Sequence, residues 1–566
     1  MAFNGKSLNL FKVASDSTNS VRQSLEIART RLLVSVVCLV LGFIVISLRL
    51  IEIGAFHRDS ELSLAQNEGY LGLHMGRESL VDRNGEILAT SISTSSLYAN
   101  ATLIQNHKEV AAKLKKVFPQ IDTKQLEEKL LSGKSFLWIA RHLTPHQQAT
   151  VIRLGIPGLE FIRDTKRVYP YGALLSHAVG FVDVDNNGIS GLEKGLDEQL
   201  RNATAPIVLS LDIRLQHALY DELMNGIEEF SAQGASGMVL DTTSGEVLAM
   251  VSLPDFDPNK PDIKNSQTLF NRNTLGVYEM GSTMKIINTA MALETETVSL
   301  DSRFDATKPL KVGRFLVTDY HGKNAWMDVR DIFLYSSNIG AARMALKAGS
   351  EKQRAFMDKI GFLTAPQSEL PEMGSPLSPS KWREANTITI SYGYGLAISP
   401  WQLSMAIAGI ANEGLMPAKP TILKKALTQV EYKRIVKKSV SLQMVRLMQE
   451  AVSEGKCKKA AVPGILVGGK TGTANRRKAH GRGYQTKDVN TTFIGIFPEN
   501  PRYLVFVMLD DPKATRSTYG FNAGGWNAAP VTSRVIKRIA PILGIYPSLD
   551  QDKFDKAPLI REIAMR

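Results

Sequence analysis

The stretch Glu279-Met280-Gly281-Ser282-Thr283-Met284-Lys285-Ile286-Ile287 places a serine and a lysine three residues apart where a helix is expected to begin. Gly281 ends the preceding segment, Ser282 suits a helix start, and the residues that follow are apolar, as in a buried helix. Positions i and i+3 of a helix share one face, so the hydroxyl and the amine are expected one turn apart. The stretch therefore predicts a nucleophile near the positive end of a helix with a base beside it.

By itself the Ser-x-x-Lys pattern is weak evidence, because the chain contains three copies of it. Ser378-Pro379-Ser380-Lys381 lies among prolines and glycines, and Ser453-Glu454-Gly455-Lys456 runs into a Gly- and Lys-rich loop. Neither copy begins an apolar helix. The competing interpretation of Ser282 is an ordinary helix N-cap with a solvated lysine behind it.

Two downstream motifs decide between these interpretations. Tyr335-Ser336-Ser337-Asn338-Ile339-Gly340 contains Ser-x-Asn, and Val467-Gly468-Gly469-Lys470-Thr471-Gly472-Thr473-Ala474 contains Lys-Thr-Gly. Each tripeptide alone would read as a polar helix end or a turn. Ser-x-x-Lys, Ser-x-Asn and Lys-Thr-Gly in this order form the signature of serine β-lactamases and penicillin-binding proteins.

The N-terminal region predicts a membrane anchor. LLVSVVCLVLGFIVISL (32–48) is an uncharged run of 17 residues flanked by Arg29, Arg31 and Arg49, which can extend a short span by snorkelling. No convincing cleavage site follows, so an uncleaved signal anchor over 32–50 is favoured over a buried core helix. By the positive-inside rule, residues 1–31 form a cytoplasmic tail and the bulk of the chain is exported to the periplasm.

Composition excludes several classes of protein. The 566 residues are 44% hydrophobic, enough for two or three folded units. Of the only two cysteines, Cys38 lies within the predicted membrane span and Cys457 would be outside it, which leaves no disulfide framework. Cys457, between lysines, is expected in an exposed loop and outside the chemistry. The net charge of +13 comes without a nucleic-acid motif. Two explanations stay open: the exported surface faces an acidic polymer or anionic headgroups, or the charge reflects a generally basic proteome. The lone His177 has no Cys/His cluster around it, so neither a metal nor a cofactor is predicted.

The exported part divides into a pedestal domain, 51–205, and a second domain, 206–545, followed by a C-terminal tail, 546–566. In the pedestal, Asn84-Gly85 is a strong hairpin signal between two strands. In the second domain, strand-like runs lie at both ends, and the region from about 254 to 460 is mainly helical. This pattern predicts one α+β domain whose sheet is built from both of its ends.

Beyond these motifs, the chain resembles the class B penicillin-binding proteins over nearly all its length after the anchor, and within them the division-specific peptidoglycan D,D-transpeptidases of Gram-negative bacteria. The resemblance rests on the motifs above and on 237–259, 391–414 and 524–531. It implies an elongated mixed α/β pedestal of the dimerisation type and a serine β-lactamase/transpeptidase-like domain, with an antiparallel sheet flanked by helices and a helical insertion. Met280 stands where relatives usually have proline.

Chemistry and resemblance together suggest roles for the motif residues. Lys285 acts as a base only when neutral, so its pKa must be lowered by burial and by a second cation, for which Lys470 is the candidate. The resemblance implies that Ser336 relays the proton and that Asn338 holds the substrate amide. It also implies that the substrate's terminal carboxylate binds at Lys470, Thr471, Gly472 and Thr473, and that the backbone N–H groups of Ser282 and Thr473 form the oxyanion hole.

The pedestal carries a second, charge-rich set of family residues. They are Arg77, Asp82, Arg83, Gly85, Arg167, Tyr169, Pro170, Gly172 and Glu193. Two interpretations stay open: the charged members are salt bridges that hold a small domain together, or they transmit contact with a glycan polymerase to the catalytic domain.

Taken together, the resemblance implies a single-pass inner-membrane enzyme that cross-links septal peptidoglycan. Its donor would be a stem peptide ending in D-Ala-D-Ala, β-lactams would acylate Ser282, and the partners would be the glycan polymerase FtsW and other divisome proteins. Three alternatives remain: the elongation-specific class B enzyme, a β-lactamase or carboxypeptidase that hydrolyses its acyl-enzyme quickly, and a non-enzymatic β-lactam sensor or scaffold.

Overall fold

The computed structural model describes residues 31, 33, 34, 36–47, 76–313, 315–426, 428, 430–477 and 484–548. The chain separates into two compact units, residues 1–74 and 75–566. In the first unit, residues 36–47 are helical with exposed apolar side chains. Among the residues described, no helix reaches the length and apolar character needed to cross a membrane.

Several of the sequence-based segments fall partly outside this description. Residues 1–30 of the predicted cytoplasmic tail, Leu32, Ser35 and 48–50 of the predicted anchor, 51–75 of the pedestal and 549–566 of the C-terminal tail lie outside the described residues. The anchor therefore stays a prediction.

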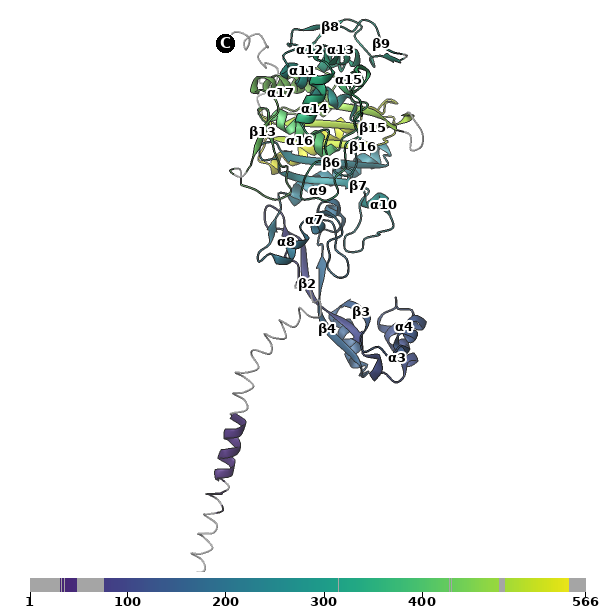
Figure 1. The fold of residues 1–566 in the computed structure, drawn as a ribbon, viewed down its shortest axis with the longest axis vertical. Helices are drawn as coiled ribbons and strands as arrows, with labels where there is room; N and C mark the ends of the chain where they lie inside the picture. Colours follow the sequence, from purple (N-terminus) through teal and green to yellow (C-terminus); the bar gives the residue numbers. More distant parts are fainter. Residues whose placement is uncertain are drawn as a thin grey trace, which may run out of the picture. The chain divides into compact units, whose positions relative to one another are not determined.

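The pedestal is built on a mixed five-stranded sheet (Figure 1). Its strands are β1 (Leu80–Val81), β2 (Ile87–Ala99), β3 (Leu137–Leu143), β4 (Leu159–Val168) and β5 (Ile207–Val208). Strand β2 pairs antiparallel with β1, β3 and β4, while β5 runs parallel to β1. The turn from β1 to β2 holds the predicted Asn84-Gly85 hairpin, where Gly85 has φ +94°, a conformation that glycine adopts without steric cost.

Short helices complete the pedestal. They are α3 (His107–Val117), α4 (Thr123–Leu131), α5 (Pro145–Arg153), α6 (Ser176–Val179), α7 (Gly191–Gly195) and α8 (Asp197–Asn202). Helices α3, α4 and α5 begin at side-chain caps, Asn106, Asp122 and Thr144, which satisfy their first backbone N–H groups. Their apolar faces form a small core of their own with β2 and β3, including Leu97, Leu114 and Leu130.

The second domain contains a five-stranded antiparallel sheet in the order β14-β15-β16-β6-β7. Its strands are β6 (Gly234–Asp241), β7 (Val247–Leu253), β14 (Gly468–Arg477), β15 (Tyr484–Phe497) and β16 (Tyr503–Asp510). The two N-terminal strands and the three C-terminal strands join edge to edge where β6 pairs with β16. The α+β domain with a sheet built from both ends is thus present, and every residue of β6, β7 and β16 is buried.

Helices lie on both sides of this sheet (Figure 1). Helices α9 (Ile213–Phe230) and α18 (Ala528–Ile542) pack against each other and against the sheet strands, and most helices of the insertion lie on the side away from α9. The insertion contains α10 (Ser266–Leu269), α11 (Met284–Glu294), α12 (Val329–Tyr335), α13 (Asn338–Ala348), α14 (Ser350–Lys359), α15 (Glu384–Ser391), α16 (Pro400–Ala411) and α17 (Lys438–Ser453).

The insertion also contains three small antiparallel pairs of strands. They are β8 (Arg303–Asp305) with β11 (Trp326–Asp328), β9 (Leu310–Val312) with β10 (Phe315–Val317), and β12 (Leu415–Pro417) with β13 (Tyr432–Arg434). Helix α11 is buried along almost its whole length. It carries Lys285 into the interior of the domain, where α13, α16 and α17 pack around it.

Candidate active site

Ser282 lies in a single 3-10 turn, Gly281–Thr283, and α11 begins two residues later at Met284. The serine is therefore not the N-cap of an α-helix: Thr283 holds that position for α11, without a capping hydrogen bond from its side chain. Gly281 has φ +52°, and a Cβ there would lie 2.5 Å from the carbonyl oxygen of Thr473. Only glycine permits this approach, which brings the turn carrying the nucleophile against strand β14.

Lys285 brings the first two motifs together. Its side chain is buried, and its Nζ lies 3.2 Å from Ser282 Oγ, 3.1 Å from Ser336 Oγ, 2.6 Å from the Ser336 carbonyl oxygen and 2.7 Å from Asn338 Oδ1. An ammonium group has three protons for these four oxygens. A neutral amine donates two hydrogen bonds and accepts one, so it fits the carbonyl and amide oxygens as acceptors and a serine hydroxyl as donor.

Electrostatics favour the neutral form of this amine. Burial lowers the pKa of Lys285 well below its ordinary value, and the positive charges of Lys470 and Lys456 lower it further, while Asp319 acts in the opposite direction. The geometry thus supplies the two causes that the sequence requires for a lysine base, burial and a nearby cation.

The Ser-x-Asn motif forms the corner between α12 and α13. Ser336 ends α12 in a left-handed conformation, φ 58° and ψ 45°, and Ser337 caps α13 by accepting from the Gly340 N–H. Asn338 Nδ2 donates to the carbonyl oxygen of Thr318 at 3.0 Å, which leaves its Oδ1 directed at Lys285. The corner therefore presents both polar side chains of the motif to one amine.

Lys470 lies on β14, one of the two edge strands of the sheet, and is fully buried. Within the described chain its Nζ has no hydrogen-bond partner, and burial is the main cause that lowers its pKa. On the same strand, a Cβ at Gly472 would lie 2.2 Å from Thr492 Oγ1 and 2.6 Å from the Met280 carbonyl oxygen. Thr473 Oγ1 accepts from the Gly524 N–H at 3.0 Å. Because a buried charge is costly without a partner, the side chain of Lys470 is suited to bind an anionic ligand.

The other two Ser-x-x-Lys copies do not form such a site. Ser378 and Lys381 are both exposed, and Ser453, at the end of α17, donates to the carbonyl oxygen of Gln449. Lys456 differs, because the structure places it beside the site although its own serine lies elsewhere.

Cys457 is a correction to the sequence-based interpretation. It does not lie in an exposed loop: it is fully buried in the core, and its Sγ lies 3.9 Å from Thr471 Oγ1. Its neighbours Lys456, Lys458 and Lys459 are exposed residues, whereas the thiol of Cys457 points into the core.

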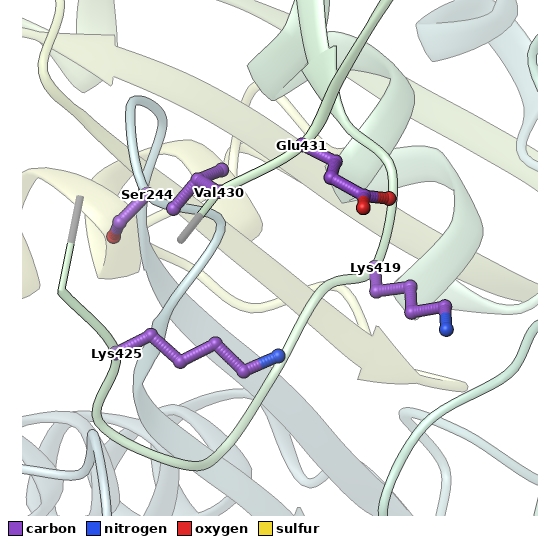
Figure 2. Close-up of a pocket in the computed structure, with 5 residues that line it drawn as sticks. All are labelled: Ser244, Lys419, Lys425, Val430 and Glu431. Carbon is purple, nitrogen blue, oxygen red and sulfur yellow. The ribbon is translucent and has the colours of Figure 1, made fainter. Parts of the chain in front are cut away.

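A pocket elsewhere on the domain has room for about 150 Å³ and is lined by Ser244, Lys419, Lys425, Val430 and Glu431 (Figure 2). Ser244 belongs to the β6–β7 turn, and none of the five residues carries a motif. Among the described residues no cluster of His, Cys, Asp and Glu is suited to hold a metal ion.

The pedestal residues form two groups rather than one. In the first, Glu193 accepts from Arg77 Nε at 2.8 Å and from Arg167 Nε at 2.7 Å, and all three side chains are buried. Arg77 also pairs with Asp197, and Arg167 Nη1 donates to the carbonyl oxygens of Arg77 and Glu78. Arg77, Arg167 and Glu193 thus form a buried ion network that extends to the partly exposed Asp197.

The second group lies at the junction with the catalytic domain. Asp82 accepts from the backbone N–H groups of Asn84 and Ile213, and Arg83 lies 3.5 Å from Glu246. The remaining members shape the backbone and packing. Gly85 and Gly172 have positive φ, Tyr169 is buried and accepts from the Val182 N–H, and Pro170 is exposed.

Comparison with known proteins agrees with this arrangement. Residues 235–537 match the penicillin binding protein transpeptidase domain, and residues 75–208 match the penicillin-binding protein dimerisation domain. The chain is 36% identical over 522 residues to a Caulobacter vibrioides protein named "Probable peptidoglycan D,D-transpeptidase FtsI", covering 90% of this chain and 88% of that one. It is 28% identical to the peptidoglycan D,D-transpeptidase FtsI of Escherichia coli, covering 83% and 84%.

A solved structure shows the same fold. Penicillin binding protein 3 of Mycobacterium tuberculosis, complexed with aztreonam, superimposes with a TM-score of 0.65 at 22% identity, covering 83% of this chain and 97% of that one.

Proposed function

The chain belongs to the class B penicillin-binding proteins, and on that premise we propose that it is a serine D,D-transpeptidase that cross-links peptidoglycan in cell division, with Ser282 as its nucleophile. The observation that carries the assignment of the site is Lys285 Nζ, which contacts Ser282, Ser336 and Asn338 at once. The names of the relatives, FtsI among them, favour the division enzyme over the elongation enzyme.

In the proposed acylation, Ser282 Oγ attacks the carbonyl carbon of the penultimate D-alanine of a stem peptide. Neutral Lys285 takes the hydroxyl proton, and Ser336, 3.1 Å from its Nζ, relays a proton to the nitrogen of the leaving D-alanine as the C–N bond breaks. The product is an ester on Ser282. An acceptor amine then attacks that ester, forms the cross-link and returns the proton to the serine.

Substrate binding follows from the charge of the site. The terminal carboxylate of the donor would pair with buried, unpartnered Lys470 and with Thr471, Gly472 and Thr473 on the edge strand. The backbone N–H groups of Ser282 and Thr473 would hold the oxyanion, since their segments meet where Gly281 approaches Thr473. A β-lactam would enter as a mimic of D-Ala-D-Ala and acylate the same serine.

We place this activity in the periplasm, on a single inner-membrane anchor over residues 32–50 behind a cytoplasmic tail of 1–31. The pedestal would span 51–205, the transpeptidase domain 206–545 and the C-terminal tail 546–566. FtsW and other divisome proteins are the proposed partners, and the support for them is the similarity to relatives named FtsI.

The proposal is tested by covalent labelling with a β-lactam. The purified full-length chain is incubated with benzylpenicillin, its intact mass is measured, and the adduct is mapped by peptide digestion. A penicilloyl group on Ser282 that disappears in Ser282→Ala and persists in the matched control Ser453→Ala supports the proposal. An adduct on Ser453 or Ser378, or none on the wild-type chain, contradicts it. Rapid loss of the adduct would point to a hydrolase instead.

A further inference from the structure

Lys456 belongs to a copy of Ser-x-x-Lys that the proposed function does not use, yet its segment lies between two walls of the site. The Lys456 N–H donates to the carbonyl oxygen of Leu334, near the end of α12 and two residues before Ser336. The next residue, Cys457, contacts Thr471 on β14 through its Sγ. This segment therefore touches both the element that carries Ser-x-Asn and the strand that carries Lys-Thr-Gly.

The ammonium of Lys456 holds a third segment, the Thr318–His321 loop. Its Nζ donates to the carbonyl oxygens of Tyr320 at 3.1 Å and His321 at 3.4 Å. Although the residue as a whole is exposed, its ammonium is partly buried, and that burial lowers its pKa. The side chain is thus fixed at its charged end.

That loop in turn orients Asn338. The Thr318 carbonyl oxygen accepts from Asn338 Nδ2 at 3.0 Å, and the Asp319 carboxylate accepts from the N–H groups of Asn338 and Ile339 at 2.5 and 3.0 Å. Asp319 also accepts from the Ser337 hydroxyl at 2.6 Å. The loop thereby fixes both the amide of Asn338 and the start of α13.

Charge adds a second connection. Three lysines, Lys285, Lys470 and Lys456, and one carboxylate, Asp319, influence one another here. Burial and Lys470 lower the pKa of Lys285, Lys456 lowers it further and Asp319 raises it. Burial and Lys456 lower the pKa of Lys470, and Cys457 acts in the opposite direction.

We infer that Lys456 is a positioning residue of the proposed acyl-transfer site, holding the Thr318–His321 loop against Asn338 and adding its positive charge to that of Lys470 near the amine of Lys285. Asp319, which lies in the loop that Lys456 holds, carries the opposite charge. The inference rests on the proposed function, because it concerns the same acylation of Ser282.

The positive charge of Lys456 and the negative charge of Asp319 predict opposite shifts of the acylation pH profile when each is removed. Lys456→Met removes a positive charge, so the protonated form of Lys285 becomes easier to reach, its pKa rises, and the acidic limb of the acylation pH profile moves to higher pH. Asp319→Asn removes a negative charge while keeping the shape of the side chain, so the limb moves to lower pH. A unit charge several ångströms away in a partly solvated site corresponds to a shift of about 0.5–1 pH unit.

The experiment measures the second-order rate of acylation of the full-length chain by a fluorescent penicillin from pH 5 to 9. Lys456→Met is expected to acylate about three- to tenfold more slowly below the limb, Lys456→Arg to keep the wild-type limb, and Asp319→Asn to shift it the other way. Lys458→Met is the matched control, an exposed lysine two residues along the same turn, and its profile is expected to overlay the wild type.

Each outcome separates the inference from the function beneath it. A wild-type chain that is not acylated overturns the proposed function. An acylated wild type with a Lys456→Met profile lowered equally at every pH, or unchanged, overturns the inference, because a purely structural role does not move the limb. If Lys456→Met fails to fold, Asp319→Asn decides alone, and a limb that stays in place overturns the inference.

Discussion

Arg167→Ala tests whether the pedestal charges hold the domain together. Arg167 is 4% exposed and Glu193 is fully buried, and their 2.7 Å pair has no solvent to replace it. Removing the arginine leaves one oxygen of Glu193 without its ion-pair partner, and the carbonyl oxygens of Arg77 and Glu78 lose the Nη1 donor. Breaking such a buried pair costs about 3–5 kcal/mol, and because Arg77 still holds the other Glu193 oxygen, the lower half of that range is expected.

The assay is thermal unfolding of the full-length variant, followed by penicillin labelling and by complementation of cells depleted of the native enzyme. For a cooperative unit of 150–250 residues the loss lowers the midpoint by roughly 6–15 °C. Arg163→Ala is the matched control, an exposed arginine on the same strand, β4, and it is expected to change stability by no more than about 0.5 kcal/mol.

A midpoint for Arg167→Ala that matches Arg163→Ala would refute this reasoning. If that variant also labelled normally yet failed to complement, the coupling interpretation of the pedestal would replace the structural one. Normal complementation would reject both.

Three further predictions address the site and its surroundings. Lys285→Ala is expected to slow acylation by at least about a hundredfold at neutral pH, the range of general-base removal; stopped-flow measurement showing a smaller loss would move the base elsewhere. Cys457→Ser is expected to leave acylation unchanged, and in a Cys38→Ser background the buried Cys457 thiol should react with DTNB only after unfolding; rapid reaction of the folded chain would contradict its burial. Burial lowers the pKa of His177 to about 4, so below about pH 6.5 the unfolded chain binds a proton at this histidine that the folded chain does not bind. The free energy of unfolding should therefore fall as the pH is lowered from 6.5 to 4. A His177→Gln variant whose stability falls with the same slope in that window would exclude this histidine as the cause.

The parts of the fold that the sequence predicts are those set by local pattern. Strands β7 and β16 are nearly continuous apolar runs, and the Asn84-Gly85 turn has a residue preference of its own. Ser282 and Lys285 are three residues apart, so one turn of backbone fixes their separation. Local sequence pattern and backbone geometry determine these features, so long-range contacts are not needed to predict them.

Residues whose partners lie far along the chain could not be predicted in this way. Asp319 belongs to none of the motifs, and Lys456 belongs to a Ser-x-x-Lys copy whose serine lies away from the site. Their contacts with Asn338 and Tyr320 exist only once the insertion has folded. Arg77 and Glu193 are 116 positions apart. The burial of Cys457 was missed because its flanking lysines indicate exposure, whereas a short turn can send alternate side chains to opposite sides.

The order of strands in the catalytic sheet has a consequence for biogenesis. β6 and β7 are synthesised about 200 residues before β14 begins, yet β6 is an interior strand whose second neighbour, β16, comes later still. About 260 residues separate the end of β6 from the start of β16. At roughly 5–20 residues per second of translation, the apolar edge of β6 therefore waits on the order of 13–52 s for its partner. During that interval it is a template for pairing with other chains. A chain that terminates early, anywhere before β16, should therefore end in aggregates and proteolysis rather than in a partly active enzyme.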